Sequence, residues 1–169
     1  MSNPEDFMAR AIEIADQAKD RMGALPYGAV VVLDGKIVGE GLNRAAALHD
    51  PTSHGEVEAI RDACRRLGTN DLTGAEMYTT AEPCAMCAAT MLMTGFARLY
   101  YAYDSAQGAA FIAPLAARDP SLKRKFTTDE LRVQTGKPTD GREAIPAERI
   151  SVEAADLVFR AFAEKRLKG

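Results

Sequence analysis

The 169-residue chain has few of the residues that most often bind metals or act as nucleophiles, with only three cysteines and two histidines. Three cysteines cannot all pair with one another. In a reducing compartment, two cysteines spaced CxxC more often bind a metal or do redox chemistry than form a permanent disulfide. A run of eighteen apolar residues is also missing, as is a basic stretch followed by an apolar one near residue 1. We therefore expect no membrane-spanning helix, no secretory signal and a cytoplasmic location.

An excess of positive charge is missing too. The chain has 21 basic and 24 acidic residues, a formal net charge of −3, and no strong cluster of basic side chains. Binding to nucleic acid depends on concentrated positive charge that displaces counterions, so we expect a small-molecule partner rather than a nucleic acid. The length and the 47% hydrophobic composition predict one folded domain that covers residues 1–169.

The order of apolar patterns predicts an α/β fold. An amphipathic helix after Pro4 has apolar residues every three or four positions, at Phe7, Ala11, Ile14, Ala15, Ala18 and Met22. Two β-branched runs then flank Asp34-Gly35, which is a strong hairpin signal. A helix that ends at Gly68, a strand at 75–80, a helix at 84–95 and a strand at 97–103 follow. This alternation implies a sheet with helices packed on it.

The chain after residue 103 is harder to interpret. Residues 104–149 form a variable segment that we expect to contain short helices joined by loops. The segment could be a lid over a pocket or a solvated surface excursion. A last helix is expected at 150–167, with its apolar residues on one side, at Val152, Ala155, Val158, Phe159 and Phe162.

Two short motifs concentrate the scarce residues. In "PCAMC", Cys84 and Cys87 stand three residues apart at the start of the predicted helix, so both sulfurs project to the same side of its first turn. In "HGE", His54 stands at the start of the other helix. One imidazole and two thiolates favour zinc, and the missing fourth protein ligand leaves a position for water, as in catalytic rather than structural zinc sites.

Glu56 completes the interpretation, because a carboxylate beside zinc-activated water can act as general base and then as general acid. Alternatives remain for each motif alone: an isolated CxxC could be a thiol–disulfide redox site, and the ligands could belong to a non-enzymatic zinc module. The redox alternative explains neither His54 nor Glu56. The other histidine, His49, is expected to be a solvated loop residue, and Cys64 a core residue.

At these residues the chain resembles the cytidine deaminase-like superfamily. The segments "NRAAALHDPTSHGEVEAIRDAC" and "LTGAEMYTTAEPCAMCAATMLMTG" are similar to those of bacterial guanine deaminases and tRNA adenosine deaminases, and H-x-E followed by P-C-x-x-C is the signature of zinc nucleobase deaminases. The resemblance implies a three-layer α/β/α fold with a mixed sheet of about five strands and helices on both faces. It also implies one Zn²⁺ per chain held by His54, Cys84 and Cys87, with Glu56 as proton shuttle. Residues expected to surround the substrate are Tyr27, Asn43, Gly55, Glu82 and Asp104.

Within the superfamily, the tail "KPTDGREAIPAERI" and its following helix resemble those of bacterial guanine deaminases, whose C-terminal segments cross to a partner subunit. This favours guanine to xanthine as the reaction, and a homodimer with an exchanged tail. Cytosine-, isocytosine-, pterin- or triazine-type rings are the next alternatives, followed by tRNA adenosine. Three departures from the guanine deaminase pattern are noted. Gly55 stands where alanine is usual, the chain ends in "RLKG" rather than an aromatic residue, and residues 105–118 lack an acidic residue, so that role would fall to Asp104, Asp119 or Glu143.

Overall fold

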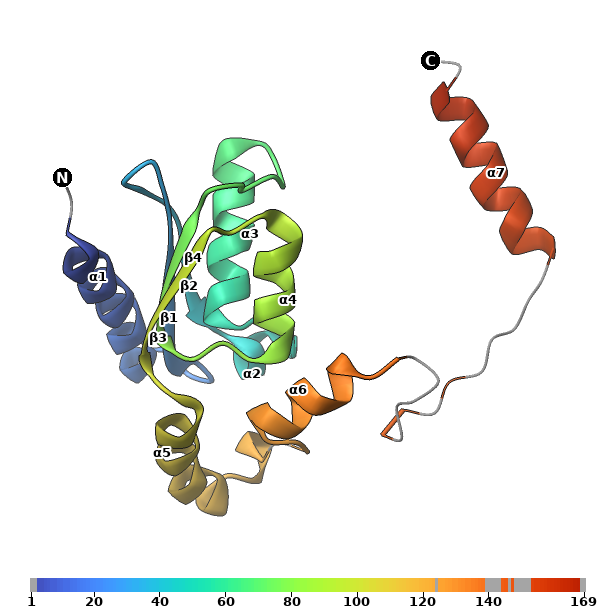
Figure 1. Cartoon of the computed structure of the whole chain (residues 1–169). Coiled ribbons are helices and arrows are strands. Elements are labelled where there is room, and N and C mark those ends of the chain that lie inside the picture. Colours follow the sequence, from blue (N-terminus) through green and yellow to red (C-terminus); the bar gives the residue numbers. More distant parts are fainter. Residues whose placement is uncertain (1–2, 124, 139–143, 146, 148–152, 168–169) are drawn as a thin grey trace. The chain divides into compact units, whose positions relative to one another are not determined.

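The computed structural model describes residues 3–123, 125–138, 144–145, 147 and 153–167. The chain divides into two compact units, residues 1–132 and residues 133–169. The first unit holds the sheet and the helices packed on it (Figure 1). The second unit holds the C-terminal helix α7, Glu153–Leu167. Residues 150–152 of the predicted last helix lie outside the described residues.

The first unit is built on a mixed sheet of four strands in the order β2-β1-β3-β4. The bounds are β1 Leu25–Leu33, β2 Lys36–Asn43, β3 Glu76–Ala81 and β4 Arg98–Tyr103. β1 is antiparallel to both neighbours, whereas β3 and β4 run parallel. The expectation of about five strands is corrected to four within the described residues. The chain after β4 forms a helix because Asp104 and Gln107 make a capping box at its start.

The β1–β2 hairpin forms at the predicted position. Asp34 and Gly35 both have positive φ angles, 51° and 70°. Two consecutive residues with positive φ make the turn whose twist matches that of a two-stranded hairpin. The local sequence therefore sets the register of the first two strands.

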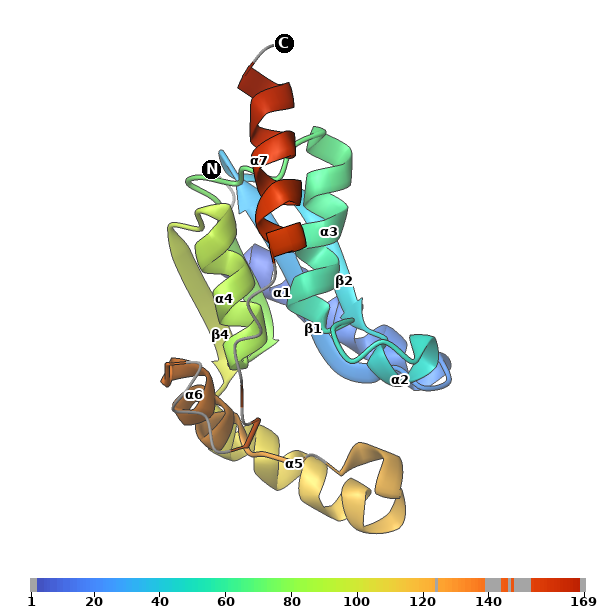
Figure 2. The ribbon, with the colours of Figure 1, turned by 90° about the vertical axis from the view of Figure 1, so that its right-hand side faces the viewer.

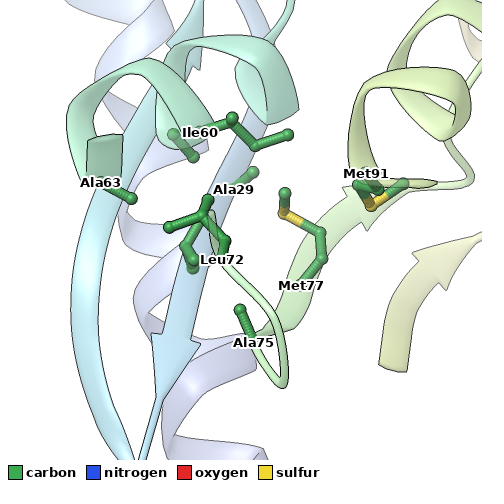
Figure 3. Close-up of a cluster of buried hydrophobic side chains, with 9 residues drawn as sticks. Ala29, Ile60, Ala63, Leu72, Ala75, Met77 and Met91 are labelled. Atoms are coloured by element: carbon green, nitrogen blue, oxygen red, sulfur yellow. The ribbon is translucent and has the colours of Figure 1, made fainter. Parts of the chain in front are cut away.

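Helices cover both faces of the sheet, as expected for a three-layer α/β/α fold (Figures 1 and 2). On one face α1, Pro4–Asp16, packs Phe7 against Val30 and Tyr78 of the sheet. On the other face lie α3, Gly55–Leu67, and α4, Ala85–Thr94. Figure 3 shows the core on that side, where helix residues Ile60, Ala63 and Met91 meet Ala29 and Met77 of the strands. Successive residues of β1 thus alternate between the two cores.

Capping residues fix the helix ends. Asn3 caps α1, and glycines with positive φ follow α3 and α4, at Gly68 (69°) and Gly95 (87°). α1 continues as a short 3₁₀ helix, η1, Gln17–Asp20. Met22 was expected on the apolar side of the first helix, but it is 98% exposed because it lies beyond both helical segments.

Four further segments complete the described helices. A single turn, α2 (Ala45–Leu48), precedes the first motif. After β4 come α5 (Ser105–Arg118), the 3₁₀ turn η2 (Pro120–Leu122) and α6 (Thr128–Gly136). The prediction of helices joined by loops between 104 and 149 agrees with these elements as far as residue 138. None of the helices in the described ranges is both long and apolar enough to cross a bilayer.

Candidate active site

Three side chains from two helix starts meet at one point. The Sγ atoms of Cys84 and Cys87 are 3.7 Å apart, and they lie 3.7 Å and 3.6 Å from His54 Nδ1. Tetrahedral zinc, with bonds of about 2.3 Å to sulfur and about 2.0 Å to nitrogen, requires ligand atoms roughly 3.5 to 3.8 Å apart. The triangle therefore has the size that zinc needs. Among the described residues, it is the one group of three or more potential ligands close enough to hold a metal ion.

Local structure brings these ligands together. His54 is the N-cap of α3, and Cys84 is the N-cap of α4. Cys87 lies in the first turn of α4, fully buried, and packs with Cys84 and Val57 in a small cluster between the two helices. Helix N-termini favour negative charge, which suits a pair of thiolates.

The electrostatics of the two thiols also suit a cation. The hydrogen bond with Cys87 lowers the pKa of Cys84 to about 3, although burial opposes the shift and His54 assists it. The same hydrogen bond raises the pKa of Cys87, and burial raises it further. The site alone therefore stabilises one thiolate. A second thiolate beside the first requires a positive charge between them, which a metal ion supplies.

Glu56 lies in the first turn of α3, two residues after His54, and is 6% exposed. Burial raises its pKa above the usual value, while a main-chain hydrogen bond and the neighbouring His54 partly oppose the shift. A carboxyl group with a raised pKa can hold and release a proton nearer to neutral pH than an exposed glutamate can.

A cavity of about 640 Å³ opens beside these groups. Its size falls in the range of about 300 to 1,000 Å³ that is typical of small-molecule sites. Seven of the residues that the sequence singled out line it: Tyr27, Asn43, His54, Glu56, Glu82, Cys84 and Asp104. The two that do not are Cys87, which is fully buried, and Gly55.

Two cavity residues come from the end of the hairpin. In β1 the register passes from Leu25 opposite Asn43 to Gly28 opposite Leu42, so Pro26 and Tyr27 form a bulge. Asn43 is 2% exposed, and its Oδ1 accepts a hydrogen bond from the Ala45 amide at 3.2 Å. Its side-chain amide nitrogen is therefore the group able to donate to a ring in the cavity.

Gly55 has a packing role in the structure. A Cβ atom there would overlap the main-chain oxygen of Tyr27. The absence of a side chain lets the start of α3 lie directly against the bulge of β1. Gly55 thus influences the cavity through the Tyr27 main chain rather than as part of its surface.

The three residues considered for the additional acidic role, Asp104, Asp119 and Glu143, lie in different parts of the chain. Asp104 lines the cavity, but its Oδ1 accepts a hydrogen bond from the Gln107 amide at 2.7 Å and caps α5. Asp119 follows the end of α5 and is not among the cavity residues. Glu143 lies outside the described residues.

The sequence did not predict the part of the cavity wall that follows β4. This part comes from α5, from the stretch before α6 and from the first turn of α6, including Asp129 and Glu130. The segment after β4 therefore lines part of the pocket, and its role as a lid stays a prediction. One signal was available: "TTDE" fits the capping box S/T-x-x-E, and Thr127 and Glu130 do exchange hydrogen bonds of 2.7 and 3.2 Å.

Comparison with known proteins agrees with this geometry. The family model for the cytidine and deoxycytidylate deaminase zinc-binding region matches residues 1–103. A tRNA-specific adenosine deaminase of Agrobacterium fabrum is 42% identical over 110 residues, which are 65% of this chain and 72% of that protein. A guanine deaminase of Bacillus subtilis is 38% identical over 107 residues, 63% of this chain and 69% of that protein.

Two solved structures are similar over different lengths. The guanine deaminase from Bacillus subtilis has a TM-score of 0.79 and 30% identity, and covers 96% of this chain and 95% of its own. A tRNA:A34 deaminase, described for A-to-I editing at the wobble position of transfer RNA, has a TM-score of 0.59 and 37% identity. It covers 73% of this chain and 95% of its own.

Proposed function

The chain belongs to the cytidine and deoxycytidylate deaminase zinc-binding family, whose members are zinc-dependent hydrolases, and from this we propose that it deaminates a free nucleobase. In this reaction the exocyclic amine of the ring is replaced by oxygen and ammonia is released. Guanine, which would yield xanthine, is the proposed substrate. The observation that favours it is the similarity of almost the whole chain to a solved guanine deaminase.

We assign the zinc to His54, Cys84 and Cys87, whose spacing fits tetrahedral coordination. When bound, zinc supplies the Lewis acidity that lets water act as a nucleophile near neutral pH. The cavity beside the ligands gives a ring access to that water.

Glu56 is the proton carrier in this proposal. Its buried carboxyl group is part of the cavity wall beside His54, and its raised pKa suits a group that alternates between charged and neutral forms. It takes a proton from the attacking water and delivers protons to a ring nitrogen and to the departing amine. Asn43 orients the ring with its side-chain amide, and Tyr27 forms part of the surface against which the ring lies.

The extent of the structural match supports the guanine branch of the proposal. The guanine deaminase covers 96% of this chain, whereas the tRNA:A34 deaminase covers 73% although it uses 95% of its own length. About a quarter of this chain therefore has no counterpart in the tRNA enzyme. The acidic charge balance, with a net charge of −3, also favours a small substrate.

Deamination of tRNA adenosine is the second candidate. It is favoured by the 42% identity with a tRNA-specific adenosine deaminase, and by Lys123 and Lys125, two basic residues on the cavity wall that could contact phosphate. Other aminated rings, including cytosine, isocytosine, pterins and triazines, belong in the same test because discrimination between rings rests on a few hydrogen bonds.

An ammonia-release screen of the zinc-loaded protein tests these candidates. Guanine, cytosine, isocytosine, adenine, aminopterins, aminotriazines, their nucleosides and a tRNA with adenosine at the wobble position should be compared at equal enzyme concentration. We expect the highest kcat/KM with guanine. Faster turnover of the tRNA, or of a single-ring base, would replace guanine with that substrate.

The variant Glu56→Gln is the control for the chemistry. We expect it to retain about one zinc per chain and the wild-type fold, measured by metal analysis and circular dichroism, and to lose about 100-fold or more in kcat. Full activity in this variant would contradict the proposed proton carrier. A wild-type protein without zinc but with disulfide reductase activity would instead support the redox alternative.

We also propose that the protein is a homodimer with an exchanged C-terminal tail. Apolar side chains are unusually exposed in both units of the single chain. They include Leu92 (81%) and Met93 (87%) of α4, and Phe159 (76%) and Phe162 (63%) of α7. Exposed apolar groups of this number are typical of surfaces that a partner subunit covers.

A further inference from the structure

Glu82 lies directly before Pro83 and Cys84 in the chain, and its carboxylate contacts both α5 and α6. Its Oε2 accepts a hydrogen bond from the Ser105 amide at the start of α5, at 2.8 Å. Its Oε1 accepts one from Arg132 Nη2 of α6, at 2.7 Å. Its own amide donates to the Tyr103 carbonyl at the end of β4, at 2.7 Å. The two carboxylate oxygens thus join two separate helices to the loop that bears a metal ligand.

Arg132 extends this network. The same Nη2 donates to the Pro83 carbonyl at 3.2 Å, and Nη1 donates to Asp129 Oδ1 at 2.9 Å. The preceding residue, Leu131, packs against the cluster of Val57, Cys84 and Cys87. α6 is therefore tied to the ligand loop by Arg132 and packs against the cysteine cluster through Leu131.

We infer that Glu82 and Arg132 are positioning residues that hold the ligand loop, the start of α5 and α6 in one arrangement. Glu82 was expected to bind substrate. Its oxygens are instead used by Ser105 and Arg132, which leaves it better suited to orienting its neighbours. The inference rests on the zinc site of the proposed function but not on which ring is deaminated.

The size of the expected effect follows from the exposure of the pair. The Arg132 and Glu82 side chains are 37% and 22% exposed, so solvent screens the ion pair and it contributes little to global stability. Groups that orient metal ligands nevertheless affect metal retention strongly, by about 10- to 100-fold. Faster loss of zinc with little change in the free energy of unfolding therefore distinguishes a positioning role from a purely structural one.

The test compares zinc-loaded variants by the rate at which they lose zinc to a coloured chelator. Arg132→Met removes the guanidinium, and Glu82→Gln removes the charge of its acceptor. Ser105→Pro removes the amide donor at the first residue of α5, a position where proline is compatible with the helix. Arg66→Met is the matched control, because it breaks an equally short ion pair, 2.7 Å to Asp62, on α3.

We expect the first three variants to release zinc about tenfold faster than wild type, and to raise KM more than they lower kcat. Arg132→Lys, which keeps the charge but lacks the second nitrogen donor, should give an intermediate rate. Arg66→Met should match wild type. Release from all variants at the rate of Arg66→Met would overturn the inference and leave the proposed function intact. A wild-type protein that binds no zinc would overturn both.

Discussion

At the scale of single residues, the glycines of β2 decide how closely α3 can approach the sheet. A Cβ atom at Gly41 would overlap the main-chain oxygen of Gly55 and the amide nitrogen of Ala59. These are backbone atoms of a buried helix, so they cannot move aside as a flexible side chain could. The position of His54 and Glu56 therefore depends on the missing side chain at residue 41.

We predict that Gly41→Ala destabilises the fold by about 1 to 3 kcal/mol, because overpacking forces the helix away from the strand. Chemical denaturation monitored by circular dichroism measures this. Gly108→Ala is the matched control, since no atom lies within 4 Å of a Cβ at that helical position. The control should be neutral or slightly stabilising, as alanine favours helix. Equal stability of the two variants would show that α3 tolerates a side chain at this contact.

At the scale of elements, an ion pair connects α1 to β2. Arg10 donates to both oxygens of Glu40, at 2.8 and 2.9 Å. The hydrogen bond from Arg10 lowers the pKa of Glu40, although burial opposes the shift. A carboxyl group whose pKa is lower in the folded state stabilises the fold above its unfolded pKa. This contribution is lost as the pH falls through the folded pKa.

We predict that Glu40→Gln lowers the free energy of unfolding at pH 7 by about 1 kcal/mol or less, because solvent screens the half-exposed pair. The difference between wild type and variant should shrink as the pH falls below about 4.5, because Glu40 becomes protonated and then carries no charge, like the glutamine. Urea denaturation across this pH range measures it. Glu13→Gln is the matched control, because it removes the other partner of Arg10 within the same helix and keeps the pair with Glu40. A difference that stays constant with pH would contradict the assignment to Glu40.

Local sequence predicted those elements whose ends are fixed by neighbouring residues. Asp34-Gly35 closes the hairpin, and Gly68 and Gly95 end their helices with positive φ. These residues could be recognised because the residue type that marks each turn in the sequence also allows the backbone conformation that the turn needs. The ligand triangle could be anticipated because each motif opens a helix. The contact of Arg132 with Glu82 could not be anticipated, since no sequence motif relates two residues that lie fifty positions apart. Contacts of this kind depend on how the segment after β4 folds back, which periodicity does not encode.

At the scale of the whole molecule, the C-terminal helix α7 carries exposed apolar side chains on which the proposed exchanged-tail dimer rests. Phe159 and Phe162 lie three residues apart on α7, on one side of the helix, and both are well exposed. Leu157 is 57% exposed but projects from the opposite side, at 3.6 residues per turn. That residues 1–169 form one domain stays a prediction.

We predict that replacing Phe159 and Phe162 together with Asp shifts the protein from dimer to monomer in sedimentation velocity, because two apolar contacts with the partner are lost. Leu157→Asp, which adds the same charge on the other side of the helix, should remain dimeric. A wild-type protein that sediments as a monomer would reject the exchanged-tail dimer. A double variant that stays dimeric would place the subunit contact elsewhere.

The parallel pairing of β3 with β4 has a consequence for how substrate range can change. Both strands end at the same edge of the sheet, where the Glu82 amide donates to the Tyr103 carbonyl, so the metal-ligand loop and α5 start side by side. The family match ends at residue 103, while much of the cavity wall comes from residues 105–130. Tyr27, Asn43, Glu56 and the metal ligands thus come from the matched region, whereas much of the remaining cavity wall comes from the residues that follow it. We expect changes after β4 that spare the contacts of Ser105 and Arg132 with Glu82 to alter which ring the cavity admits, whereas changes at those two contacts also disturb the metal-ligand loop.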